Sequence, residues 1–185
     1  NKPVDVALDG AKVQVLCGSA RFTLQTMPVE EYPRLPDMPT SSGTVKADDF
    51  AIAVAQASAA AGRDEMLPLL TGVRLELEGS TVSLMATDRF RASLRDLTWY
   101  PERGDISAHA LVPARVLGET ARSLTGSGDV TIAVSAGESG DGLIGFEGSV
   151  GTGTRRTTTR LLEGDFPRVR QLFQAQADTV AYVST

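Results

Sequence analysis

The chain has 185 residues, of which 42% are hydrophobic and 22% are charged, a balance typical of a soluble globular protein with at least one core. Its net charge of −5 argues against a protein that grips DNA through many phosphate contacts, although a closed ring could be acidic outside and basic only where it faces the duplex. The start, Asn1 to Asp5, has no initiator Met and no signal-peptide character, so we expect a cytoplasmic protein and a fragment of a longer one.

Few residues in the chain could support catalysis or metal binding. Cys17 and His109 are the only cysteine and histidine, which makes a zinc site or a Ser-His-Asp triad unconvincing, and we expect no cofactor and no metal. Cys17 falls in a strand-like run and is best interpreted as a small buried residue. A hydrolase using Asp88 or Ser93 is the enzyme alternative, but Asp88 beside Arg91 is more typical of a turn cap or an ion pair.

The first 42 residues predict strands followed by a connector. Apolar and polar residues alternate from Val4 to Met27, with turns at Asp9-Gly10 and Gly18-Ser19, which indicates antiparallel strands. Residues 27–42 carry four prolines, a composition that stops both helices and strand ladders. We place a domain boundary near residue 41.

The next stretch predicts a strand, a helix and three strands. Residues 45–61 indicate a strand and then a helix that Asp48 or Asp49 could cap. The three strands are expected at 72–77, 82–87 and 91–97, and Trp99-Tyr100-Pro101 at the start of a surface connection.

The same order is predicted a second time, with a strand ending at Val112, a helix from Pro113 through Leu124, and three strands between 130 and 161. Pro113 lies 66 residues after Ala47, which suggests a duplicated half-domain. A second repeat relates the segment from Arg21 to Arg34 to the segment from Arg155 to Arg168, so a whole domain ends twice in the chain.

Three motifs carry a family resemblance. Leu70-Thr71-Gly72-Val73, the run from Ala86 to Arg91, and Gly164-Asp165-Phe166-Pro167 resemble those of the bacterial DNA sliding clamp, the beta subunit of DNA polymerase III, in order and spacing. The resemblance implies an α+β clamp fold, with antiparallel sheets outside and helices lining a ring. It also implies the end of a first clamp domain and a linker at 1–40, a second domain at 41–166, and the start of a third at 167–185.

The resemblance further implies a non-catalytic processivity factor. Such a factor is a homodimeric ring around duplex DNA that holds the replicative polymerase, the clamp loader and repair polymerases through Gln-Leu-x-Leu-Phe-like peptides. The peptides would enter an apolar pocket between the second and third domains, as such anchors require. The matching positions are Leu70, Thr87, Arg89, Phe90, Arg91, Ala92, Pro167, Gln171 and Leu172. As isolated residues, Leu70, Phe90 and Leu172 would instead be ordinary core positions.

DNA contact is assigned to the helix side of the ring. Arg115 and Arg122 are seven positions apart and share a helix face, and Arg63 follows the first helix. Their alternative interpretation is as solvated surface arginines. The sequence departs from the best-known clamp pattern at Arg89-Phe90, where Gly-His is common, and at Gln171, where Arg is common. A repeat-built scaffold or adhesion module without DNA function is the alternative to the clamp.

Overall fold

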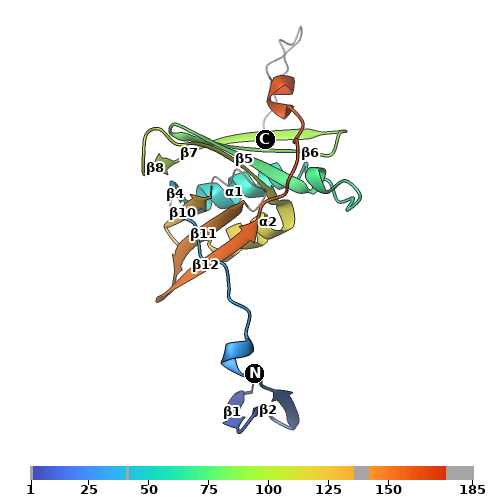
Figure 1. The fold of residues 1–185 in the computed structure, drawn as a ribbon, viewed down its shortest axis with the longest axis vertical. Coiled ribbons are helices and arrows are strands. Elements are labelled where there is room, and N and C mark those ends of the chain that lie inside the picture. The colour runs from blue at the N-terminus through green and yellow to red at the C-terminus, as the bar shows by residue number, and fades with distance from the viewer. Residues whose placement is uncertain (1, 41, 136–141, 174–185) are drawn as a thin grey trace. The chain divides into compact units, whose positions relative to one another are not determined.

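The computed structural model describes residues 2–40, 42–135 and 142–173. The chain divides into two compact units, Asn1–Pro36 and Asp37–Thr185, which are drawn together in Figure 1 and are described separately below. Among the described residues, no helix combines the length and apolar character needed to cross a bilayer.

The first unit is a three-stranded antiparallel meander with one apolar face. Its elements are β1 (Asp5–Asp9), β2 (Lys12–Cys17), β3 (Ala20–Gln25) and the short 3-10 helix η1 (Val29–Glu31). Strand pairing places Val6, Val15 and Phe22 in one row across the sheet. Gly10 and Gly18 form the two turns with positive φ angles of 57° and 60°. Cys17 ends β2 and is partly buried.

In its described residues, the second unit contains two α-helices, two short 3-10 helices and two antiparallel sheets. The helices are α1 (Ala47–Ser58), α2 (Ala114–Ser123) and the 3-10 helices η2 (Pro68–Thr71) and η3 (Val169–Phe173). The strands are β4 (Gly43–Lys46), β5 (Gly72–Glu78), β6 (Thr81–Thr87), β7 (Ala92–Thr98), β8 (Tyr100–Pro101), β9 (Ser107–Pro113), β10 (Asp129–Val134), β11 (Leu143–Val150) and β12 (Gly153–Arg160).

The expected half-domain repeat is present as two runs of strand, helix and three strands. The first run is β4, α1, β5, β6 and β7, and the second is β9, α2, β10, β11 and β12. Each run gives its first strand to the other run's sheet, because the sheet orders are β7-β6-β5-β9 and β12-β11-β10-β4-β8. The two halves therefore form one α+β structure built from two similar runs, as expected.

One main core lies between the helices and the two sheets. Phe50, Val54 and Ala57 recur at helical spacing along α1 and are buried, and the ring of Phe50 lies 5.6 Å from that of Phe146 on β11. Figure 1 shows α1 and α2 side by side between the sheets, in agreement with their direct packing. The inward residues of β5 and β6 complete this core, so their outward residues are left for other contacts.

Two local expectations are wrong. Neither Asp48 nor Asp49 caps α1, since the N-cap is Lys46 without a side-chain bond, and Asp48 Oδ1 instead accepts a hydrogen bond from the Gly126 N–H at 3.4 Å. Trp99 does not begin a surface connection, because it is 1% exposed and its indole Nε1–H donates to the Gly79 carbonyl at 2.8 Å.

Candidate functional site

The turn from Thr87 to Arg91 is fixed by its own polar side chains. The Asp88 carboxylate accepts the backbone N–H groups of Phe90 and Arg91, each at 3.0 Å. Its second oxygen bonds the Arg91 guanidinium at 3.1 Å. The Thr87 hydroxyl donates to the Arg91 carbonyl at 2.8 Å and accepts from the Arg89 N–H at 3.1 Å. Arg89 can therefore hold a φ of 81°, which is uncommon for a residue with a side chain.

Asp88 has a structural role in this turn. The hydrogen bond from the Arg91 backbone N–H is the main cause that lowers the pKa of its carboxyl, and the bonds from the Phe90 N–H and the Arg91 side chain add to it. Because these donors stabilise the charged form, the carboxylate serves as the cap and ion-pair partner of the turn. The turn-cap interpretation is confirmed.

The turn presents an aromatic side chain next to a hollow. Phe90 is 92% exposed, the largest exposed fraction among the large hydrophobic side chains that the structure describes. The neighbouring hollow has a volume of about 420 Å³. It is lined by Ala61, Gly62, Arg63, Asp64, Leu67, Leu70, Asp88, Arg89, Phe90 and Arg91.

Leu70 forms the inner wall of this hollow because a backbone bond fixes its position. The Gly62 N–H donates to the Leu70 carbonyl at 2.7 Å, and the Leu70 N–H donates to the Leu67 carbonyl at 2.9 Å. A Cβ at position 62 would lie 3.2 Å from the Leu70 carbonyl oxygen, so the close approach favours glycine. The hollow thus has a fixed apolar wall at Leu70, and Phe90 belongs to the same lining.

Residues 161–173, here called the connector, cross the outer face of the sheet that contains β5, β6 and β7. The Leu162 N–H donates to the Leu111 carbonyl of β9 at 2.8 Å. Phe166 and Val169 are then buried against Met85 and Leu111 in a second apolar cluster. The 3-10 helix η3 contacts β6 and β7, the strands that flank the Thr87–Arg91 turn. Connector and turn therefore share one sheet.

The predicted site residues divide between two hollows. Leu70, Arg89, Phe90 and Arg91 line the hollow beside the turn. Pro167 and Gln171 line a different hollow, of about 530 Å³, together with Met85. Thr87 is buried at the end of β6, and Ala92 packs against the second cluster, so both support the walls. Leu172 is 67% exposed and lines neither hollow.

Some lining residues were not predicted from the sequence. Gly62 and Leu67 lie in the loop after α1, and only the tertiary fold brings this loop to the turn. Met85 points outward from β6 while Leu84 and Ala86 point into the main core. This alternation is visible in the sequence. An apolar residue at an outward position, here Met85, indicates that another segment covers that face of the sheet.

The three predicted DNA-facing arginines are all exposed, but they are not equally placed. Arg63 and Arg115 line a common hollow of about 430 Å³ between the end of α1 and the start of α2. The Arg115 guanidinium is 3.3 Å from the Glu119 carboxylate on the next turn of α2. Arg122 lies in the last turn of the same helix. Arg115 and Arg122 therefore lie at opposite ends of α2, and Arg63 lies on the Arg115 side.

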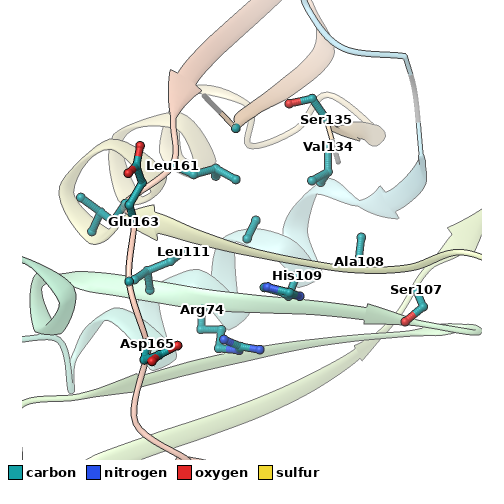
Figure 2. A pocket seen from close by; sticks show the side chains of 14 residues that line it. Arg74, Ser107, Ala108, His109, Leu111, Val134, Ser135, Leu161, Glu163 and Asp165 are labelled. Atoms are coloured by element: carbon teal, nitrogen blue, oxygen red, sulfur yellow. The ribbon is translucent and has the colours of Figure 1, made fainter. Parts of the chain in front are cut away.

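A further hollow, of about 400 Å³, lies beside the free edge of β9 and contains none of the predicted site residues. Figure 2 shows Val134 and Ser135 on one side of it and Arg74 and Asp165 on the other. His109 also lines it. In the described part of the chain, no three His, Cys, Asp or Glu side chains come together as a metal site.

Known proteins resemble this chain throughout its length. The sequence model of the DNA polymerase III beta subunit central domain matches residues 44–168, and that of the N-terminal domain matches residues 1–36. The beta sliding clamp of Streptomyces coelicolor is 54% identical over 185 residues, covering 100% of this chain and 48% of that protein. The beta sliding clamp of Micrococcus luteus is 46% identical, covering 97% of this chain and 58% of that protein.

A solved structure of a DNA polymerase III beta subunit also has the fold of this chain. The crystal structure of the DNA polymerase III subunit beta from Pseudomonas aeruginosa has a TM-score of 0.75 and 25% sequence identity. The match covers 95% of this chain and 46% of that one. The chain thus spans about half the length of the proteins that it matches.

Proposed function

Because the chain belongs to the DNA polymerase III beta subunit family, we propose that its full-length protein is a processivity clamp of the bacterial replicative polymerase. The protein would be a non-catalytic, cytoplasmic accessory subunit that encircles duplex DNA and tethers partner enzymes. The complete ring would be a head-to-tail homodimer of subunits with three similar domains. We assign residues 1–40 to the end of the first domain, 41–166 to the second and 167–185 to the start of the third.

The partner site of this clamp would lie at the turn and the connector. The observation that carries the assignment is the hollow between the buried wall of Leu70 and the exposed ring of Phe90. An extended peptide requires apolar holes for its Leu and Phe anchors and polar groups for its backbone. Leu70 and Phe90 would contact the anchors, while Arg89 and Arg91 offer donors at the rim.

The two-hollow arrangement is compatible with one peptide path. Pro167 and Gln171 lie on the connector, and the connector rests on the same sheet as the turn. We propose that Pro167, Gln171 and Leu172 form the opposite wall once the remainder of the third domain is in place. Thr87 and Ala92 would hold the two walls at a fixed separation.

A peptide titration of the full-length protein tests this site. Phe90→Ala is the sharpest variant, because a side chain that is 92% exposed can be shortened without loss of packing. Losing one apolar anchor contact corresponds to roughly 1–3 kcal/mol, so we expect the dissociation constant of a fluorescent Gln-Leu-x-Leu-Phe peptide to rise about five- to hundredfold. Leu172→Glu should weaken binding as well.

The matched control is Ile52→Ala, which removes another exposed apolar side chain, 53% exposed, from α1. It should leave peptide affinity within twofold and, like the other variants, leave the thermal melt close to wild type. Equal affinities for wild type, Phe90→Ala and Leu172→Glu would place the peptide site elsewhere.

The DNA role is assigned to the arginines at the helices. Arg63, Arg115 and Arg122 would contact phosphates weakly, since an acidic chain with few basic partners gains little from counterion release. The clamp would therefore stay on DNA by encirclement. We expect this chain alone to bind duplex DNA with a dissociation constant no tighter than about 1 μM at physiological salt, and reversal of charge at Arg115 and Arg122 to weaken it further.

A further inference from the structure

A second polar contact attaches the connector to the sheet, well away from the Thr87–Arg91 turn. Arg170 of η3 places its Nη2 atom 3.0 Å from the Glu76 carboxylate of β5, across 94 positions of sequence. The other oxygen of the same carboxylate accepts from Arg74 Nε at 2.9 Å. Glu76 thus binds one guanidinium with each oxygen.

Arg74, Glu76 and Arg170, here called the charged triad, are partly buried, which distinguishes their contacts from an ordinary surface ion pair. The side chains of Glu76 and Arg74 are 20% and 26% exposed, and that of Arg170 is 39% exposed. Solvent screening is weaker at such partly buried positions than at fully exposed ones. Without the Glu76 charge, Arg74 and Arg170 would each lose the carboxylate oxygen that they bind.

The contact between Arg170 and Glu76 also joins the connector to the sheet by charge. Among the residues that the structure describes, Arg170 to Glu76 is the one ion pair that joins residues 161–173 to the sheet. The other attachments are the Leu162 backbone bond at the start and the burial of Phe166 and Val169. Apolar contacts are non-directional, so they keep the connector on the sheet without fixing the rotation of η3.

We infer that Arg170, through Glu76, is a positioning residue for the peptide site: it fixes η3, and with it the wall that Pro167, Gln171 and Leu172 are proposed to form. This inference rests on the proposed function. Arg170 lies directly before Gln171 and follows Pro167 by three positions, so its ion pair holds the short segment that carries the proposed wall. Arg74 keeps Glu76 in place for this contact.

The test uses the full-length protein with the variants Glu76→Gln, Arg170→Gln and Arg170→Lys. We expect the dissociation constant of the Gln-Leu-x-Leu-Phe peptide to rise about three- to tenfold in the two glutamine variants. Amide hydrogen exchange of residues 168–173 should become faster in the same variants. Arg170→Lys keeps the charge and should recover most of both properties.

Two controls separate positioning from general stability. Arg103→Gln breaks an exposed ion pair to Asp105, 3.9 Å apart, and should change neither property. The double variant Glu76→Gln, Arg170→Gln should have a peptide dissociation constant no higher than that of the single glutamine variant with the lower affinity, because both changes remove the same contact.

The outcomes distinguish a failure of this inference from a failure of the proposed function. If the wild type binds the peptide and the glutamine variants bind it equally well, the inference is wrong and the proposed function stands. It is also wrong if affinity falls without faster exchange at 168–173, or if Arg170→Lys behaves like Arg170→Gln. If the wild type does not bind the peptide at all, the proposed function and this inference both fail.

Discussion

Gly164 lies against the side chain of Leu69, so closely that a Cβ at position 164 would be 2.9 Å from Leu69 Cδ2. The backbone of Gly164 also has a φ of 130°, a region that residues with side chains rarely adopt. Leu69 packs with the second apolar cluster, so this contact determines how the connector leaves β12 and reaches Phe166. The backbone conformation and this close contact therefore explain why glycine is favoured as the first residue of the Gly-Asp-Phe-Pro motif.

Gly164→Ala should accordingly destabilise the connector by roughly 1–3 kcal/mol, the usual cost of a strained backbone position. We expect a lower urea midpoint in circular dichroism and weaker peptide binding in the full-length protein. Gly104→Ala is the control, since its Cβ would meet nothing within 4 Å and its φ is ordinary. Equal midpoints for the two variants would show that position 164 is not strained.

Trp99→Phe should destabilise the second unit by about 1–3 kcal/mol, because the Gly79 carbonyl loses its indole donor and the core loses volume. The measurement is urea unfolding followed by circular dichroism, since the variant has no tryptophan fluorescence. Tyr100→Phe, at a neighbouring side chain that is 58% exposed, should change the midpoint little. A Trp99→Phe midpoint equal to that of Tyr100→Phe would contradict the burial of the indole.

The Thr87–Arg91 turn should be insensitive to pH from neutrality down to mildly acidic conditions. The pKa of Asp88 is lowered from its ordinary value of 3.8, so its carboxylate stays charged above that value and its stabilising effect is fully present there. The effect is lost only as pH falls through the lowered pKa. In an NMR titration, the amide signals of Phe90 and Arg91 should shift below pH 3.8. A midpoint above it would contradict the capping role.

Gly118→Ala should stabilise the protein by roughly 0.5–1 kcal/mol, because glycine inside a helix costs conformational entropy. Gly118 lies within α2, and a Cβ there would meet nothing within 4 Å. Gly126→Ala is the opposite case, since its φ of 77° favours glycine, and its melting temperature should fall. Thermal melts of both variants should therefore move in opposite directions.

Local patterns predicted much of the second unit because its strands alternate regularly and its helices have apolar residues at helical spacing. The Asp88 cap was also predictable, since its partners lie within three residues of it. Trp99 was misplaced because its Tyr-Pro neighbours indicate a turn, while its burial depends on Gly79 twenty positions earlier. The contact between Glu76 and Arg170, separated by 94 positions, has no local signature at all.

The exchange of first strands between the two half-domains has a consequence for assembly. A free-standing first half would expose the edge of β5 that β9 now covers, and its own β4 would have no sheet to join. Two copies of such a half could pair with each other, because the first strand of each copy could cover the exposed sheet edge of the other. Joining the halves in one polypeptide turns that two-body encounter into an intramolecular one, and the completed domain then forms independently of protein concentration.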